Sequence, residues 1–155
     1  MTRLAQALLR GSSSLAPGER ELIAAYTSAQ NECEFCAGSH SATARHLLGD
    51  DAEVVGQVLE EGVEEADLDE KMKALLCIAD KVRRDARSVS EEDVDRARKH
   101  GAGDKAIHDT VLIAAAFCMY NRYVDGLDTP TPDDEAAYEE HGEDLATNGY
   151  TSVVE

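Results

Sequence analysis

Ten consecutive apolar residues, Val111 to Tyr120, place the strongest constraint on how this chain can fold. A helix that spans a bilayer needs about 20 such residues, so this run is too short to cross a membrane. Its flanks predict a helix from about Asp104 to about Asp125, before Gly126. A helix without a polar face must be buried on all sides. We therefore expect this helix to form either the centre of the domain or part of a subunit interface.

The rest of the chain also has a helical pattern, and no strand-type alternation bounded by turns is found. One stripe of apolar residues advances in steps of four, three, four and three, as expected for one face of a helix: Leu68, Met72, Leu75, Ala79 and Val82. With 155 residues and no Gly/Ser linker, the chain suits one domain. The sequence predicts a single all-α domain over residues 1–155, with about seven or eight helices.

Local signals predict where several of these helices begin. Pro17 suits the first position of an early helix, and Thr131-Pro132 predicts the start of the last one. Asp67, three residues before Glu70, is predicted to cap the helix that carries the apolar stripe. Between them, a helix is expected to begin near Asn31 to Cys33 and to end at Gly49.

The charge of the chain excludes several classes of partner. It has 32 acidic residues against 15 Lys and Arg, for a formal net charge of -17. Such a polyanion is repelled by nucleic acid and by anionic membrane surfaces, so neither is expected as a partner. No targeting segment is visible at the N-terminus, and we expect a cytoplasmic protein.

Four cysteines occur, and two of them are spaced as a C-x-x-C pair: Cys33, Cys36, Cys77 and Cys118. A structural disulfide framework is not expected in a reducing cytoplasm, where such a pair more often serves redox or metal chemistry. Cys77 and Cys118 lie within apolar helical stretches, and we expect them to be buried small hydrophobic residues.

The segment Glu32 to His40 carries the most informative pattern. If Cys33 lies in the first turn of a helix, Cys36 is rotated by about 60° from it and His40 falls between the two in angle, so all three share one face. The helix N-terminus favours an anion and so lowers the pKa of a cysteine there. The histidine can accept or shuttle the proton. A peroxide can then oxidise one thiolate, and its neighbour resolves the product to a disulfide.

Two other interpretations of this segment remain open. Sulfur and imidazole ligands also suit zinc. A closed zinc site needs four ligands, however, and no second C-x-x-C or H-x-x-x-H pair follows, so we predict no metal at this site. A zinc-binding or redox-sensing module is therefore kept as an alternative, together with a purely structural role in the core.

At these residues the chain resembles the alkylhydroperoxidase D (AhpD)-like group of the carboxymuconolactone decarboxylase superfamily. Cys33, Cys36 and His40 match its C-x-x-C-x-x-x-H motif, and Glu21 stands where the family has a glutamate on the preceding helix. The segment 121–127 resembles a motif of the peroxidase-related members. The resemblance is clearest over residues 17–128. From the residues alone, Glu21 would be read as a surface acid.

The resemblance implies a thiol-dependent peroxidase or a dithiol–disulfide oxidoreductase that needs no bound cofactor. Cys36 would attack the hydroperoxide or disulfide substrate, and a more exposed Cys33 would form the disulfide with it. Glu21 and His40 would relay the proton. Electrons would come from a dithiol donor such as a lipoyl protein, or pass to a peroxiredoxin. Homo-oligomers, trimers or hexamers, are also implied, and the apolar helix agrees with them.

Phe35 is a departure from the family pattern. The best-studied type has an extra histidine just before the second cysteine, where this chain has Phe35. An apolar ring cannot move protons, so the substituted position points to a different substrate or to disulfide reduction. A cofactor-free decarboxylase acting on a small lactone acid is the alternative enzyme within the superfamily, although such a reaction has no need of a C-x-x-C pair.

Overall fold

The computed structural model describes residues 1–151, which form eight α-helices, two short 3-10 helices and no strand. The α-helices are α1 (Thr2–Arg10), α2 (Pro17–Gln30), α3 (Glu34–Leu48), α4 (Glu53–Glu60), α5 (Glu70–Asp85), α6 (Glu91–Lys99), α7 (Asp104–Gly126) and α8 (Glu135–Asn148). The 3-10 helices are η1 (Gly49–Asp51) and η2 (Ala86–Ser88). The predicted single all-α domain is confirmed; residues 152–155 of the predicted range lie outside the described part.

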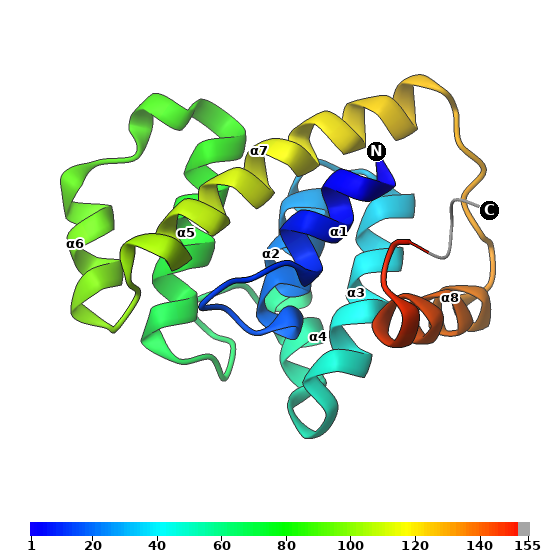
Figure 1. Ribbon diagram of the computed structural model, residues 1–155, viewed down its shortest axis with the longest axis horizontal. Helices are drawn as coiled ribbons and strands as arrows, with labels where there is room; N and C mark the ends of the chain where they lie inside the picture. Colours follow the sequence, from blue (N-terminus) through cyan, green and yellow to red (C-terminus); the bar gives the residue numbers. More distant parts are fainter. Residues whose placement is uncertain (152–155) are drawn as a thin grey trace.

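The helix at the centre of the domain is α2 (Figure 1). It packs against α1, α3, α4, α5 and α7. Its buried positions include polar ones, which must find partners inside the protein. Arg20, for example, is 3% exposed and donates to the backbone carbonyls of Leu8 and Gly11 at 3.0 and 2.9 Å. The loop between α1 and α2 is therefore fixed to the central helix.

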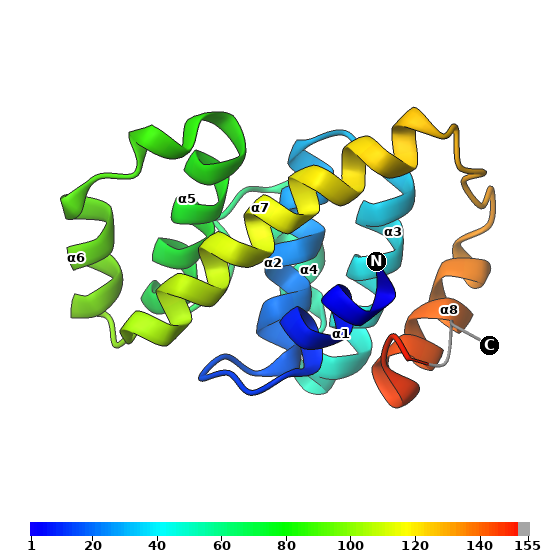
Figure 2. The ribbon, with the colours of Figure 1, turned by 45° about the horizontal axis from the view of Figure 1, so that its top comes forward.

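The prediction that the apolar helix is buried on all sides is wrong for a single chain. In α7, which crosses α2 and α5 (Figure 2), Ile113 and Phe117 are buried, whereas Leu112 and Met119 are 41% and 46% exposed. Because α7 lies at the edge of the helical layer, no helix among residues 1–151 covers its outer face. Cys77 and Cys118, predicted to be buried, are only partly so.

Most helix boundaries follow local signals, with two corrections. Pro17 opens α2 as predicted. The cap of α5 is Asp69, not Asp67, because the Asp69 carboxylate accepts from the Met72 N–H at 2.7 Å. The last helix begins at Glu135, not at Thr131-Pro132, since Asp134 provides its cap.

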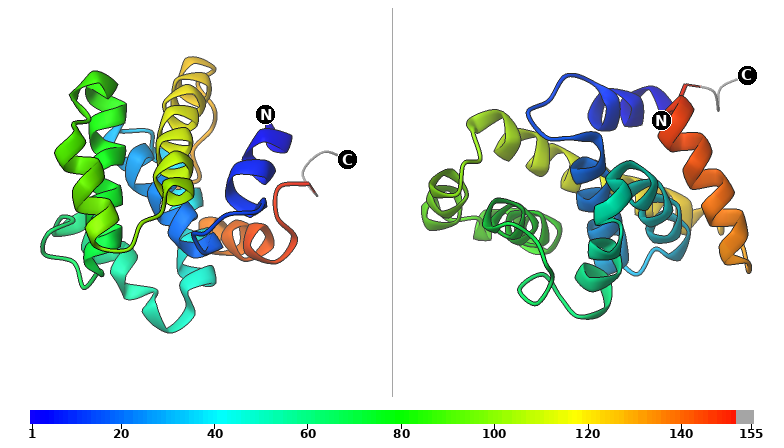
Figure 3. Two further views of the ribbon diagram at one scale, coloured as in Figure 1. Left: turned by 60° about the vertical axis from the view of Figure 1, so that its left-hand side comes forward. Right: turned by 90° about the horizontal axis from the view of Figure 1, so that it is seen from below.

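Helices α3 and α8 approach closely, which positions the later C-terminal residues. A Cβ atom added at Gly142 would lie 2.6 Å from the Cβ of Ala42 and 2.8 Å from its carbonyl carbon. Only a glycine fits at this contact. The turn after α8 then returns the chain to α1, and Figure 3 shows the two segments at the same end of the molecule. The Tyr150 N–H donates to the Gln6 side-chain oxygen at 2.8 Å.

No helix within the described residues is long and apolar enough to cross a membrane.

The contact between α3 and α8 generates the first prediction. Gly142→Ala should lower the free energy of unfolding by roughly 1–3 kcal/mol, because the added methyl group overpacks against backbone that cannot yield. Gly56→Ala, in α4, is the matched control, since an added Cβ meets nothing within 4 Å there. That variant should gain about 0.5–1 kcal/mol from helix propensity. Urea unfolding of both variants measures the difference, and equal stabilisation of the two would contradict the close contact.

Candidate redox site at the start of helix α3

The turn between α2 and α3 places the two cysteines. Glu32 adopts a left-handed conformation (φ 59°), which reverses the chain, and the Cys33 N–H donates to the Ser28 carbonyl at 3.0 Å. Cys33 is the N-cap residue of α3, and Cys36 lies in its first turn. The predicted placement of the C-x-x-C pair at a helix N-terminus is therefore confirmed.

Both thiols are buried, which corrects two expectations. Cys33 is 0% exposed and Cys36 is 4% exposed, so the first cysteine is not the more accessible one. Burial, together with a hydrogen bond to Asp125, raises the pKa of Cys33 to about 12. Burial also raises the pKa of Cys36. Hydrogen bonds from Cys33 and Asn121 act in the opposite direction, but the pKa is still raised. Because desolvation outweighs the helix end, a base is needed to form the thiolate.

His40, one turn beyond Cys36, is paired with Glu21 as the family resemblance implies. The His40 Nδ1 atom lies 2.7 Å from the Glu21 Oε2 atom. The Glu21 carboxylate is 0% exposed, so the reading of it as a surface acid is wrong. A carboxylate can only accept, which assigns the proton to His40 Nδ1 and leaves Nε2 as the free base. The imidazole ring packs edge-on against Phe117, with the ring centroids 4.6 Å apart.

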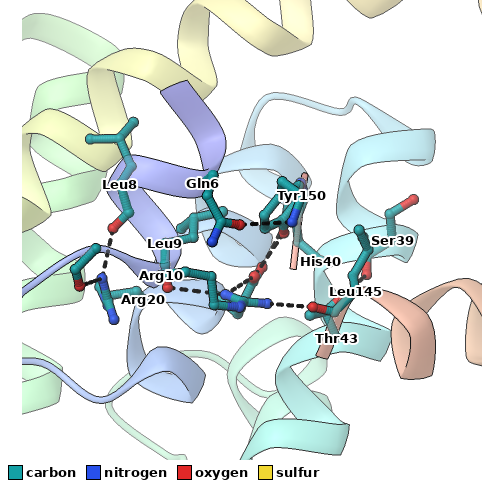
Figure 4. A network of polar contacts seen from close by, with 12 residues as sticks. Gln6, Leu8, Leu9, Arg10, Arg20, Ser39, His40, Thr43, Leu145 and Tyr150 are labelled. Atoms are coloured by element: carbon teal, nitrogen blue, oxygen red, sulfur yellow. Dashed lines mark hydrogen bonds and ion pairs between the residues drawn. The ribbon is translucent and has the colours of Figure 1, made fainter. Parts of the chain in front are cut away.

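Two residues that the sequence reasoning missed complete the surroundings of Glu21 (Figure 4). The Arg10 guanidinium lies 2.6 Å from Glu21 Oε1, and the Tyr150 hydroxyl donates to the same oxygen at 2.7 Å. Burial acts to raise the pKa of Glu21, but the combined effect of His40, Arg10 and Tyr150 lowers it. Arg10 and Tyr150 come from opposite ends of the chain, and no local motif marks either of them.

Asn121 and Asp125 of α7 also reach the dithiol. The Asn121 side chain is held by Ser28 and Asn31, at 3.0 and 2.9 Å. It is 2% exposed and forms the hydrogen bond that favours the Cys36 thiolate. Asp125 instead keeps the Cys33 proton in place. Both residues belong to the segment that resembles the peroxidase-related motif, which was the available signal for them.

A cavity of about 200 Å³ opens beside Cys36 and His40, and Cys33 does not line it. Its walls are mostly apolar: Met1, Ala5, Phe35, Phe117, Tyr120 and Val124. A small molecule in this cavity would meet the sulfur of Cys36 before that of Cys33. A larger cleft of about 400 Å³ lies between α2, α4 and α5, but it holds no cysteine or histidine.

Among residues 1–151, no group of three or more His, Cys, Asp or Glu side chains is arranged so that it could hold a metal ion.

Comparison with known proteins decides the family. The model of the carboxymuconolactone decarboxylase family matches residues 1–80, more than half of the chain. The chain belongs to this family. Among curated proteins, this member of the carboxymuconolactone decarboxylase family finds no match.

Two solved structures resemble this family member over most of its length. One is an uncharacterized peroxidase-related protein from Silicibacter sp. TM1040, with 30% identity, a TM-score of 0.79, and coverage of 89% of this chain and 70% of that one. The other, from Ralstonia eutropha JMP134, is described as an alkylhydroperoxidase AhpD core and an uncharacterized peroxidase-related protein. It has 31% identity and a TM-score of 0.78, and the match covers 88% and 70% of the two chains. The AhpD-like, peroxidase-related resemblance is thus confirmed.

The lowered pKa of Glu21 generates a prediction for acid stability. The pKa of the Glu21 carboxyl is lower in the folded state than its ordinary value of 4.5. The carboxylate therefore stabilises the fold at pH values above 4.5, and this stabilisation is lost as the pH falls below 4.5 toward the folded-state pKa. Glu21→Gln should lower the free energy of unfolding by about 3–5 kcal/mol at pH 7, because the substitution leaves Arg10 buried without its counter-charge. Its stability should then fall less between pH 6 and pH 3 than that of the wild type.

Urea unfolding at each pH measures both effects. Asp93 and Asp109, whose pKa values are also lowered, remain in the variant, so some acid sensitivity should persist. An acid dependence identical to that of the wild type would show that Glu21 makes no such contribution.

Proposed function

We propose that this protein is a thiol-dependent peroxidase or dithiol–disulfide oxidoreductase of the AhpD-like type. The observation that carries the proposal is the position of Cys36, which shares the apolar cavity with His40 while Cys33 lies behind it. The peroxidase-related neighbours support the same class of chemistry. The proposed reaction needs no bound cofactor and takes place in the cytoplasm.

The proposed cycle begins with proton transfer from Cys36 to His40. The Cys36 thiolate attacks the terminal oxygen of a hydroperoxide ROOH, the O–O bond breaks, and the RO⁻ leaving group takes the proton from His40 and departs as ROH. Cys36 is then a sulfenic acid. The Cys33 sulfur attacks it, an S–S bond forms, and water leaves with the Cys33 proton. A dithiol donor returns two electrons and two protons and is itself oxidised to a disulfide.

The pKa values of the two thiols support this division of roles. Asp125 favours the protonated form of Cys33, whereas Asn121 favours the thiolate of Cys36. The thiol that is easier to ionise is the better first nucleophile at neutral pH. Cys36 is therefore the proposed peroxidatic residue and Cys33 the resolving one.

The walls of the cavity favour an organic hydroperoxide over hydrogen peroxide. Phe35 and Phe117 offer aromatic surface beside Cys36, and burying an alkyl or aryl group there gains binding energy that hydrogen peroxide cannot supply. Because Phe35 stands where the best-studied type of the family has an extra histidine, His40 is the proposed base. The reductant is proposed to be a dithiol donor such as a lipoyl protein, and a peroxiredoxin is the proposed alternative acceptor of the electrons.

Free-thiol titration tests this function. Reduced protein treated with one equivalent of cumene hydroperoxide should lose two thiols, with a Cys33–Cys36 disulfide found by peptide mass mapping. Cys36→Ser should consume no peroxide, whereas Cys33→Ser should consume one equivalent and stop at the sulfenic acid. Cys77→Ser is the matched control and should behave like the wild type.

Survival of all four thiols in excess peroxide would overturn the proposal. Release of carbon dioxide from a lactone acid by such a protein would then support the decarboxylase alternative. Stoichiometric zinc in protein purified without added metal would instead support the metal-binding module.

We also propose that the protein assembles as a homo-oligomer, a trimer or a hexamer, through α7. Exposed apolar side chains follow one another along its outer face and at the residue that caps its end: Leu112, Met119, Tyr123 and Leu127, of which the last two are 53% and 62% exposed. Met1 and Leu4 of α1 extend the same kind of exposed apolar surface at 54% and 43%. Contiguous apolar patches of this kind are typical of subunit interfaces.

Light scattering coupled to size exclusion tests the assembly. Tyr123→Asp should shift the protein to monomers at micromolar concentration, because a buried, unpaired carboxylate disfavours association. Asp95→Asn, on the exposed side of α6, is the control and should leave the mass unchanged. A monomeric wild type would overturn this proposal.

A further inference from the structure

Glu21 has more partners than a two-residue proton relay requires. Its Oε2 atom faces His40 at 2.7 Å, and its Oε1 atom faces both Arg10 at 2.6 Å and Tyr150 at 2.7 Å. The carboxylate therefore accepts from three donors, one of them a permanent cation. Figure 4 shows the three donors, Arg10, His40 and Tyr150, gathered from α1, from α3 and from the segment after α8.

We propose that Arg10 and Tyr150 are positioning residues that hold the Glu21 carboxylate as a fixed anion. The proton removed from Cys36 then stops at His40 and does not pass on to Glu21. This inference rests on the proposed function, because it specifies how the proposed base works. It changes the role of Glu21 from a member of the proton relay to the group that orients the base.

Charge pairing supports this assignment. The Arg10 side chain is only 12% exposed, and the Glu21 side chain is 0% exposed. A proton on Glu21 would leave the guanidinium of Arg10 largely buried without a counter-charge, which is costly. The positive charge of Arg10 balances the negative charge of Glu21, so the two together carry no net charge. The proton taken from Cys36 is therefore better held on the imidazole.

Hydrogen-bond geometry supports it independently. A carboxylate that accepts several hydrogen bonds is stabilised in its charged form. Tyr150 contributes twice, since its hydroxyl donates to Glu21 and its oxygen lies 3.2 Å from His40 Nδ1, where it can accept. The Tyr150 ring also stacks on the imidazole, with the centroids 6.0 Å apart. Both contacts keep the Nδ1 side of His40 turned toward Glu21 and its Nε2 side free.

The two positioning residues are themselves fixed. Arg10 donates to the backbone carbonyls of Leu9 and Leu145 at 3.0 and 3.1 Å, and its guanidinium lies 5.2 Å from the centroid of the Tyr150 ring. The Tyr150 backbone is bound to Gln6. Neither residue is a freely rotating surface side chain, so both can impose an orientation on the carboxylate.

Other charged or titratable groups among the described residues also lie around His40. Cys36 lies on the same helix, and Met1, which precedes α1, and Tyr120 of α7 line the shared cavity. Arg20 of α2 interacts with Glu21 through space. Phe117 of α7, which contacts the imidazole, carries no charge. Arg10 and Glu21 are thus the pair whose removal should change the titration of His40 most.

Titration of the His40 ring by NMR, in full-length reduced protein, tests the inference. The His40 signal is assigned by its loss in His40→Gln. Glu21→Gln removes the negative neighbour and should lower the His40 midpoint by about one pH unit. Arg10→Gln removes the positive neighbour and should raise the midpoint by about one pH unit. Arg10→Lys should return it toward the wild-type midpoint.

The rate of Cys36 alkylation by iodoacetamide, followed by mass spectrometry, provides the second readout. Its pH profile should move with the His40 midpoint in each variant. Tyr150→Phe keeps the ring but loses the hydroxyl, and it should slow alkylation about 3- to 10-fold, as expected for a misaligned base. Shifts of the same sign in Glu21→Gln and Arg10→Gln, or no shift in folded Arg10→Gln, would overturn the inference.

These measurements use no peroxide, so the two proposals can fail separately. Opposite shifts in a protein that consumes no hydroperoxide would leave the positioning roles in place and remove the peroxidase. Peroxide consumption without the opposite shifts would leave the peroxidase and return Glu21 to the proton relay.

Discussion

A single carboxylate in the central helix organises this structure. Glu21 lies in the second turn of α2 and has no contact with solvent. A buried charge is tolerated only when it is paired and hydrogen-bonded, and here the partners come from three separate segments of the chain. α1 brings Arg10, α3 brings His40, and the turn after α8 brings Tyr150. The docking of both chain ends is thereby linked to the geometry of the candidate catalytic base.

The dithiol illustrates how competing electrostatic effects are settled by burial. A helix N-terminus favours a thiolate, yet desolvation is the largest effect on both cysteines and raises both pKa values. What distinguishes the thiols is their hydrogen bonds to α7: Asn121 favours the anion of Cys36, whereas Asp125, whose charge also raises the pKa of Cys36, bonds to the protonated Cys33. The proposed reaction therefore depends on a nearby base to a greater degree than the helix position alone suggests.

Local patterns in the sequence predicted the parts of the molecule that local interactions determine. The all-α class, the start of α2 at Pro17 and the place of Cys33 at the head of α3 all follow from residues within a few positions of one another. Family resemblance added Glu21, which periodicity alone would have assigned to the surface. The exposed outer face of α7 was not predicted, because the same apolar run suits a central helix and a subunit interface equally well.

Arg10 and Tyr150 could not be predicted, because their role arises from a contact between segments 140 positions apart in the chain. An arginine at the end of a short amphipathic helix is ordinary, since it complements the helix dipole. A tyrosine in a polar tail carries no pattern at all. Only the folded arrangement shows that both face one carboxylate.

The late position of Tyr150 in the chain also has a consequence for biosynthesis. During translation α1, α2 and α3 emerge first and can pair early, but the last donor to Glu21 leaves the ribosome only after α8 has been made. Until then the carboxylate lacks one of its three hydrogen bonds, and the imidazole lacks the ring that stacks on it. The arrangement around the candidate base is therefore complete only once the segment after α8 has been made and has packed beside Glu21.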